Sequence, residues 1–543
     1  MSRPYFHMKS LNYLILFVIS LAFAACGQDP STEEISEQLS LMSGDANRDS
    51  LYNKVYSVTD FQPIWVKAQG LNSQGEDFLT YLEEVKYDGL DKTDYLYDEI
   101  ESLVDELSTS DDPELHAVLD MMLSNSFLKL SHDLDLGKVD PTKLNMDWKI
   151  ESEPAGEDYH ALLVDISKNN ASVSNTLDKL RPDNFRYEQL RAMLKRAMEE
   201  EEEEIIVLSF DGKVEQGESH EKIPAIRRKL IHTGDLKSYT PTDSTIYDDR
   251  LAEGVRLFQR RHGLNDDGVL GQDFIEAINY SNQDLITKLK VNLERFRWLP
   301  NFTEGEGDKV IVNIPDFFLD YISGNDTIFR SRVVVGKEYR QTPVFSSKMS
   351  YLVFSPTWTL PNTILWEDAI PAIQRDRGYL EKNKMQVINN QGEPVDASRI
   401  DWKNADKGNF PYMIRQSPGA HNSLGRVKFM FPNDYSIYIH DSPAKALFDK
   451  DERTFSSGCI RLEKPQEFAS LLLKDSGWDD TEIVQAMDMK SEKNVNLERN
   501  PEVWILYLTI WENKDGIQVR EDVYGGDRTL AKALSLPVSN YFL

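Results

Sequence analysis

The sequence changes its hydrophobic periodicity near residue 300, and this change limits the folds open to the chain more than any other feature. Before it, apolar residues recur at spacings of three and four, as in Leu190-Met193-Leu194-Ala197, which is typical of one face of an α-helix. After it, apolar runs such as KVIVNIPDFFLDYI and IFRSRVVVG are bounded by Pro, Gly and Asn, as is usual for β-strands. We therefore expect an α+β multidomain chain.

The length of the chain indicates several domains, because 543 residues are too many for one hydrophobic core. We predict a helical domain over residues 51–220, a small helical domain over residues 221–284 and a mostly-β domain over residues 285–543. Within the last, prolines and glycines punctuate residues 355–412. That stretch favours an inserted cap of helices and loops over regular strands.

The acidic composition excludes nucleic acid as a partner. The formal net charge is −30, whereas binding to phosphates needs a basic stripe, which this sequence lacks. Six consecutive glutamates, Glu199 to Glu204, are candidate metal ligands. We interpret them as a solvated helix end, because calcium ligands alternate with turn residues.

The first 26 residues have the order of a secretory signal. Basic residues precede an apolar run from Tyr13 to Ala25, which is short for a membrane span and ends at Cys26. The segment resembles a bacterial lipoprotein signal, in which Cys26 becomes the lipidated first residue. Residues 27–50 then form a polar tether. An ordinary cleaved signal and an uncleaved anchor are the alternatives.

The cysteine count makes Cys459 informative. The chain contains two cysteines, Cys26 and Cys459, so lipidation of the first leaves the second without a disulfide partner in the chain. Such a thiol is either reactive or accidental. A zinc site with two thiolates is excluded and the nine histidines show no ligand-like pairing, so we predict no metal site.

Two short segments offer reactive side chains to one groove. Reading IYIH with period two places Tyr438 and His440 on the face opposite the two isoleucines. By the same rule, Cys459 and Arg461 share the outward face of CIRL. We expect both of these faces to be accessible and to lie close together.

These residue types in this order suit covalent catalysis. A free cysteine has a pKa of about 8.5, and a neighbouring histidine raises its reactive fraction. Cys459 and His440 are therefore candidates for nucleophile and base. A backbone carbonyl could orient the imidazole, and the N–H groups of the turn Ser456-Ser457-Gly458 could stabilise an oxyanion. A buried cysteine that lies near a surface histidine by chance is the alternative.

The predicted small helical domain contains the segment LAEGVRLFQRRHGLNDDGVLG, which starts at Leu251. Its order of a helix, GL, DG, LG and a further helix resembles the three-helix peptidoglycan-binding domain of bacterial wall enzymes. That resemblance implies peptidoglycan as a partner. A plain helical linker domain is the alternative.

The order H…(S/T)xGC(I/V)R around Cys459 resembles the catalytic signature of the L,D-transpeptidase family, the YkuD-type domain. The common form has histidine two positions before the cysteine and glycine after the catalytic histidine, where this chain has Ser457 and Asp441. The segments QSPGAHNSLGRVKFMFPN and IHDSPAKALFDKDERTFSSGCIRLEKPQEFA resemble the large YcbB-like subgroup. That subgroup combines a helical scaffold domain, a peptidoglycan-binding domain and a capping insertion.

The resemblance implies a role for each matching position. Cys459 would be the nucleophile, His440 the general base and Gly458 part of the oxyanion turn. The implied substrate-binding residues are Arg461, Tyr438, Ser457 and Trp358, with core packing as the alternative for Trp358. The implied activity is cross-linking of peptidoglycan tetrapeptide stems without a cofactor, in the periplasm of a Gram-negative bacterium, with carbapenems as covalent inhibitors.

Other functions are open on the sequence alone. The chain could be a non-catalytic lipoprotein that tethers the envelope to peptidoglycan, or a carboxypeptidase or lipoprotein-attachment enzyme of the same fold. The sequence does not choose the acceptor, the membrane leaflet, the oligomeric state or the starting methionine, Met1 or Met8. It also does not indicate what the helical domain does.

Overall fold

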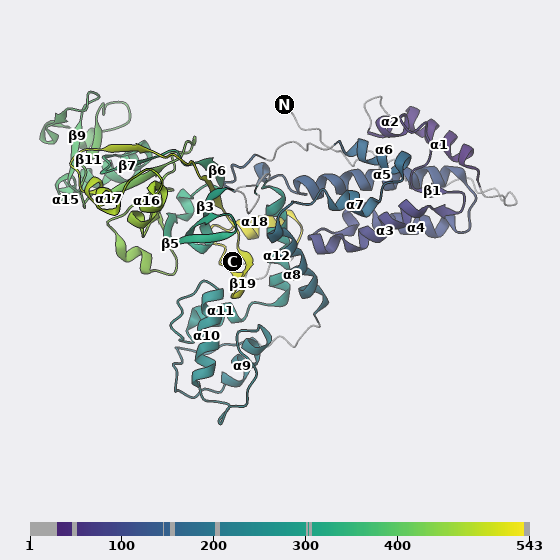
Figure 1. Ribbon diagram of the computed structural model, residues 1–543, viewed down its shortest axis with the longest axis horizontal. Helices are drawn as coiled ribbons and strands as arrows, with labels where there is room; N and C mark the ends of the chain where they lie inside the picture. Colours follow the sequence, from purple (N-terminus) through teal and green to yellow (C-terminus); the bar gives the residue numbers. More distant parts are fainter. Residues whose placement is uncertain are drawn as a thin grey trace. The chain divides into compact units, whose positions relative to one another are not determined.

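The structure is a computed structural model that describes residues 30–45, 51–144, 146–151, 158–200, 207–299, 302 and 307–536. The signal peptide, Cys26 and Glu201–Glu204 lie outside the described residues. Within them, no helix is long and apolar enough to cross a membrane. The chain forms two compact units (Figure 1). The first comprises Met1–Glu83, Asp91–Ser131 and Glu157–Asp178, and the second comprises Glu84–Leu90, His132–Gly156 and Lys179–Leu543.

The first unit is helical and is organised around Asp120 on its longest helix, α5 (Pro113–Leu136). The buried Asp120 carboxylate accepts hydrogen bonds from the Tyr56 hydroxyl at 2.6 Å and from the Trp65 backbone N–H at 2.7 Å. The other elements are α1 (Thr32–Asp45), α2 (Leu51–Tyr56), β1 (Val66–Lys67), β2 (Gly70–Leu71), α3 (Ser73–Glu84), α4 (Tyr97–Leu107), α6 (Tyr159–Asn169) and α7 (Val173–Asp178).

In the second unit, helices α8 (Phe185–Glu199) and α12 (Asn282–Arg297) join the core of the large β-sheet. Tyr187 and Leu190 on α8 are buried in the same cluster as Leu293 on α12 and the sheet residues. Helix α8 belongs in sequence to the stretch 51–220, but its apolar stripe contributes to the core of this second unit.

A three-helix region follows α8, formed by α9 (Ile223–His232), α10 (Asp249–Arg261) and α11 (Gln272–Ile278). Its separate core contains Leu251, Val255 and Phe258 from α10, together with Phe274 and Ile278 from α11. Leu251, Val255 and Phe258 have the spacing of one helical face, and the prediction of a small three-helix domain is confirmed.

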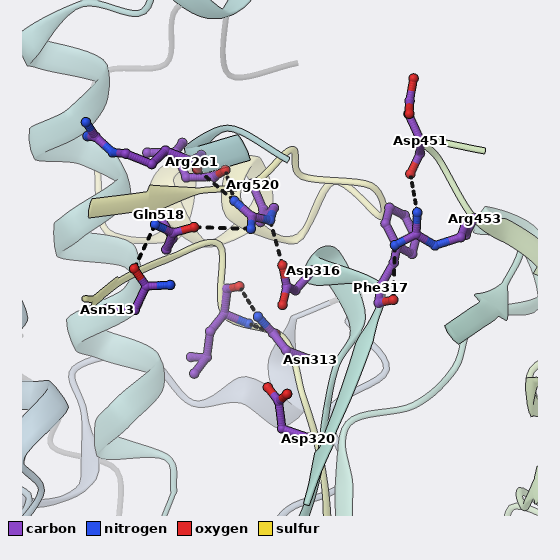
Figure 2. A network of polar contacts seen from close by, with 12 residues as sticks. Arg261, Asn313, Asp316, Phe317, Asp320, Asp451, Arg453, Asn513, Gln518 and Arg520 are labelled. Atoms are coloured by element: carbon purple, nitrogen blue, oxygen red, sulfur yellow. Dashed lines mark hydrogen bonds and ion pairs between the residues drawn. The ribbon is translucent and has the colours of Figure 1, made fainter. Parts of the chain in front are cut away.

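A buried polar network joins α10 to the β-rich part of the same unit (Figure 2). Arg261 Nε donates to the Ile517 carbonyl at 2.8 Å, and Arg520 Nη1 donates to the Arg261 carbonyl at 2.7 Å. Arg520 Nε also donates to Asp316 Oδ1 at 2.8 Å. The charges of Arg520 and Arg330 overcome the effect of burial and hold the pKa of Asp316 below its usual value.

The β-rich part contains an eleven-stranded sheet with the order β16-β7-β12-β13-β15-β5-β4-β3-β17-β6, in which β14 also pairs with β5. Most neighbours are antiparallel, but β13 runs parallel to β15, β17 to β3 and β14 to β5. The strands are β3 (Asp308–Asn313), β4 (Phe318–Ser323), β5 (Asp326–Gly336), β6 (Phe345–Lys348), β7 (Tyr351–Phe354), β12 (Val427–Met430), β13 (Ile439–His440), β14 (Thr454–Ser456), β15 (Ile460–Leu462), β16 (Lys493–Asn496) and β17 (Glu502–Leu506).

Three short helices and a hairpin complete this part: α16 (Pro465–Leu473), α17 (Asp480–Met487), α18 (Gly526–Ala533) and the antiparallel pair β18 (Ile510–Asn513) and β19 (Gly516–Val519). The sequence predicts one strand from Val503 to Trp511. The strand ends at Leu506 because asparagine side chains then bind the backbone: the Leu508 N–H donates to Asn313 Oδ1 at 2.9 Å and the Thr509 N–H to Asn292 Oδ1 at 3.0 Å.

The insertion that follows β7 has its own core and its own sheet, and we call it the cap. Its sheet has the order β10-β9-β11-β8, so the expectation of helices and loops instead of strands is wrong here. The strands are β8 (Trp358–Thr359), β9 (Met385–Ile388), β10 (Pro394–Val395) and β11 (Met413–Gln416), and the helices are α13 (Asn362–Ile364), the π-helical turn Leu365–Ala369, α14 (Ile370–Arg375) and α15 (Tyr379–Lys382). Strands of two to four residues are too short to show a period of two.

Candidate active site

Two neighbouring parallel strands carry the candidate nucleophile and base. In the pairing of β13 with β15, Ile439 lies opposite Ile460 and His440 lies opposite Arg461. The Ile460 N–H donates to the Tyr438 carbonyl at 3.1 Å, which brings Cys459 beside Tyr438. The period-two prediction that these side chains share one groove agrees with this register.

The turn before Cys459 is held by two hydroxyl groups. The Gly458 N–H donates to Ser456 Oγ at 3.1 Å, and Ser456 Oγ donates to the Cys459 carbonyl at 2.6 Å. Thr342 Oγ1 donates to the Gly458 carbonyl at 2.7 Å. Gly458 has a φ of +110°, which L-residues rarely adopt. The Gly458 N–H is already engaged by Ser456 Oγ. The Cys459 N–H, by contrast, has no acceptor among the described residues.

The Cys459 thiol is half-buried, and its Sγ lies 3.6 Å from the Ser436 carbonyl oxygen. Burial raises the pKa of this thiol. The backbone and phenol of Tyr438 and the positive charge of Arg461 act in the opposite direction, toward the thiolate. Because burial dominates, the resting group at neutral pH is the thiol.

The His440 imidazole is 4% exposed, so the prediction of an accessible histidine is wrong. Its Nδ1 lies 2.5 Å from the Asp441 carbonyl oxygen. A carbonyl only accepts, so Nδ1 carries the proton and Nε2 is left as the basic nitrogen. Burial, assisted by the charge of Arg461, lowers the pKa of His440 to about 4. The imidazole is therefore neutral at pH 7 and able to accept a proton.

Asp441 occupies the position at which the common family signature has glycine, and its side chain fixes the loop after His440. Its carboxylate accepts hydrogen bonds from the Arg426 N–H at 2.9 Å and the Ser442 N–H at 2.7 Å, and it pairs with Lys445 at 2.8 Å. A Cβ on Gly425 would lie 2.3 Å from the Asp441 carboxyl group. The carboxylate thus holds in place the residue whose carbonyl orients the imidazole.

One arginine connects the nucleophile turn to the cap. Arg340 Nη1 donates to Ser457 Oγ at 3.1 Å and to Asp368 Oδ2 at 2.6 Å, and Nη2 donates to Glu367 Oε2 at 2.7 Å. Both acids lie on the π-helical turn of the cap. Ser457 is exposed, and its hydroxyl is the group of the nucleophile turn that contacts Arg340.

Arg461 lies opposite His440 on the neighbouring strand. It is half-buried, and it has no hydrogen bond or ion pair with any residue that the structure describes. The ring centroid of Tyr438 lies 5.6 Å from that of His440. The phenol of Tyr438 and the charge of Arg461 both act on the Cys459 thiol.

The other residues predicted for the site are not placed beside Cys459 by the described structure. Trp358 lies on β8 and packs against the core of the cap, which agrees with its packing alternative. Cys26 lies outside the described residues. In the described part of the chain, no group of three or more His, Cys, Asp or Glu residues is placed to hold a metal ion.

Sequence reasoning missed the supports of the turn. Ser456 belongs to the turn predicted to stabilise an oxyanion, but no role of its own is predicted for its hydroxyl, although small hydroxyl residues beside glycine are typical of tight turns. Thr342 and Arg340 come from a segment more than a hundred residues upstream. No local pattern indicates that this segment lies beside the nucleophile.

Comparison with known proteins identifies the parts of the chain. Residues 307–484 match the family described as "L,D-transpeptidase catalytic domain", residues 50–194 match "Scaffold domain" and residues 219–278 match "Putative peptidoglycan binding domain". The chain thus contains a YkuD-type L,D-transpeptidase catalytic domain together with scaffold and peptidoglycan-binding domains.

A "Putative L,D-transpeptidase" of Haemophilus influenzae is 37% identical over 257 residues, which cover 47% of this chain and 51% of that protein. The chain thus spans about half the length of this relative. The crystal structure of an L,D-transpeptidase from Xylanimonas cellulosilytica is 11% identical and aligns over 55% of this chain and 99% of its own. That of an L,D-transpeptidase from Stackebrandtia nassauensis is 12% identical and aligns over 56% of this chain and 97% of its own. Their TM-scores are 0.18 and 0.21, which carry no argument about fold or activity.

Proposed function

We propose that the chain is an L,D-transpeptidase that forms peptidoglycan cross-links through a thioester on Cys459. What supports this proposal is the parallel pairing of β13 and β15, which puts the half-buried Cys459 at the start of the strand next to that of His440, whose neutral imidazole is oriented by a carbonyl, in a domain of this class. A metal ion or cofactor is not needed for this chemistry.

In the first half-reaction, Cys459 Sγ attacks the carbonyl that follows the L-centre of a tetrapeptide stem. His440 Nε2 takes the thiol proton, and the C–N bond to the terminal D-alanine breaks after the proton passes to the leaving amine. In the second, an amine of another stem attacks the thioester and gives its proton through His440 to the departing thiolate. The pair then returns to its resting state.

The oxyanion of each tetrahedral intermediate needs a donor beside the thiol. We assign this role to the Cys459 N–H, because the Gly458 N–H is already bonded to Ser456 Oγ. Gly458 contributes the left-handed conformation, with a φ of +110°, of the residue that precedes this N–H. Arg461 and Tyr438 steady the substrate beside the thiol.

The three-helix region fits a role in holding the active site against peptidoglycan. We propose that Cys26 is lipidated and anchors the protein on the periplasmic side of a Gram-negative envelope. If the variant Cys26→Ser stays as firmly bound to membranes as the wild type, this anchor is wrong, and the proposed chemistry is not affected.

Covalent labelling by a carbapenem tests the enzyme proposal. We expect one adduct per wild-type molecule in intact mass spectrometry, and none on Cys459→Ala. No adduct on the wild type, or an adduct that persists on Cys459→Ala, would favour a non-catalytic protein that only tethers peptidoglycan. Analysis of muropeptides after incubation with sacculi then distinguishes a cross-linking enzyme from a carboxypeptidase or a lipoprotein-attachment enzyme.

A further inference from the structure

Lys428 lies on the strand next to the candidate base and continues a row of three side chains. β12 pairs with β13 so that Lys428 lies opposite His440, and β13 pairs with β15 so that His440 lies opposite Arg461. Across three adjacent strands, the histidine is therefore flanked by a cation on each side. The Lys428 Nζ lies 5.8 Å from the centre of the Tyr438 ring, and the Tyr438 phenol contacts the Cys459 thiol.

Neither cation has a counterion among the residues that the structure describes. Both side chains are half-buried, and neither forms a hydrogen bond or an ion pair with any described residue. This is unexpected in a chain with 91 acidic and 61 basic residues, where a half-buried cation would readily find a carboxylate. Two unpaired cations beside a nucleophile indicate that the partner they lack is an anionic substrate.

We propose that Lys428 is a specificity-determining residue that pairs with a free carboxylate on the acyl residue of the donor, the residue that becomes bonded to Cys459. This inference rests on the proposed function. Arg461 would take the other carboxylate, which is the terminal carboxylate of the leaving D-alanine. The charges of Arg461 and Lys428 both favour the Cys459 thiolate, and that of Arg461 also lowers the pKa of His440, as expected for the cation nearer the leaving amine. The preferred donor therefore carries a free carboxylate on each side of the scissile bond.

Two donors that differ at one group test this assignment. Both are tetrapeptide stems, and they differ in whether the side-chain carboxyl group of the third residue is free or an amide. Release of D-alanine by the full-length protein gives kcat/KM for each. We expect the wild type to prefer the free acid about tenfold to a hundredfold, in the range expected for a hydrogen bond to a charged group at a half-buried site.

Substitutions of Lys428 distinguish a role in donor specificity from a general effect on catalysis. Lys428→Met should bring the ratio of the two donors close to one, mainly by losing activity on the free acid, while Lys428→Arg should retain the preference. Lys348→Met is the matched control, since this exposed lysine lies on β6 at the far edge of the same sheet. Equal losses on both donors in Lys428→Met, or an unchanged ratio, would overturn the assignment.

A binding measurement keeps this inference distinct from the proposed function. Calorimetric Kd values for the two donors on Cys459→Ala, with and without Lys428→Met, do not depend on turnover. A wild type that releases no D-alanine from either donor contradicts the proposed function. A donor preference in Kd that Lys428→Met abolishes would still support the carboxylate site, whereas equal Kd values would contradict it.

Discussion

Arg340 Nη1 lies 2.6 Å from Asp368 Oδ2, and the same nitrogen donates to Ser457 Oγ at 3.1 Å. One guanidinium therefore holds both the cap and the residue two positions before the nucleophile. Its side chain is 13% exposed, while those of Glu367 and Asp368 are 60% and 48% exposed. Pairs with such exposed partners contribute about 1 kcal/mol or less each. This contact should thus fix the position of the cap without dominating the stability of the fold.

Arg340→Ala should loosen the cap. A loss of about 1 kcal/mol corresponds to about a fivefold rise in the population of open states. We expect hydrogen exchange in α14 to accelerate by about that factor, with little change in the melting temperature. Arg399→Ala is the matched control, because Arg399 lies on the same cap and its ion-paired side chain is 84% exposed. Equal exchange rates in the two variants would show that Arg340 does not hold the cap.

Thr342→Val should slow catalysis by disturbing the nucleophile turn. The substitution leaves the Gly458 carbonyl without its donor and the Gly336 N–H without its acceptor. A buried polar group without a partner costs about 1–3 kcal/mol. We expect kcat for D-alanine release to fall about tenfold or more with KM little changed. Thr342→Ser keeps the hydroxyl and should retain most of the activity; if it is as slow as Thr342→Val, packing of the methyl group is responsible.

The pH dependence of thiol alkylation should follow the raised pKa of Cys459. The thiolate fraction of a group that titrates above pH 9 grows about tenfold per pH unit between pH 7 and 8.5. We expect the rate of iodoacetamide labelling of Cys459 to rise accordingly, without a plateau in this range. A plateau near neutral pH would mean that the resting pair is a thiolate and an imidazolium.

Acylation by a carbapenem should depend on pH differently, because it uses His440 as the base. Burial lowers the pKa of His440 to about 4, so the imidazole stays neutral down to about pH 5. We expect the acylation rate to vary little between pH 5 and 7 and to fall below that range. A rate that falls between pH 7 and 6 would place the pKa of the base near the usual value for histidine.

Acid should destabilise the second unit partly through His262. This imidazole stacks on the Phe258 ring at 3.8 Å, and burial lowers its pKa to about 3. Below pH 6.5 the unfolded chain therefore binds a proton that the folded chain does not, so the stabilising contribution present at neutral pH is lost as the pH falls. Between pH 6 and 4 this loss is about 2.5 kcal/mol.

Comparing His262→Gln with the wild type isolates this contribution. Groups with an opposite effect, such as Asp320, whose pKa burial raises to about 6, are present in both proteins. We expect the free energy of unfolding, measured with urea, to fall less steeply with acid in His262→Gln. Parallel pH profiles would show that His262 does not titrate differently in the folded state.

The grouping of Tyr438, His440, Cys459 and Arg461 could be predicted because it depends on local alternation within two short segments. The register of β13 and β15 agrees with it. The burial of His440 could not be predicted in the same way. It depends on the loop after β13, which the Asp441 carboxylate ties to the backbone of Arg426, and this contact joins residues from different segments.

Contacts between residues far apart in the sequence, and very short strands, explain the other features of the site and the cap that could not be predicted. Lys428, Thr342 and Arg340 reach the site through pairings between strands and turns that are far apart in the sequence. The cap strands β8 and β10 have two residues each, so they leave no periodic signal. By contrast, the three-helix region was predictable, because Leu251, Val255 and Phe258 repeat at helical spacing within one element.

The most direct test of the account is the mass of the intact protein shortly after mixing with a tetrapeptide donor in the absence of an acceptor. We predict a gain equal to the donor minus D-alanine, mapped to the peptide that contains Cys459, and no gain on Cys459→Ala. His440→Gln should form the same adduct much more slowly. Release of D-alanine with no adduct at any time, or an adduct that survives in Cys459→Ala, would contradict the thioester mechanism.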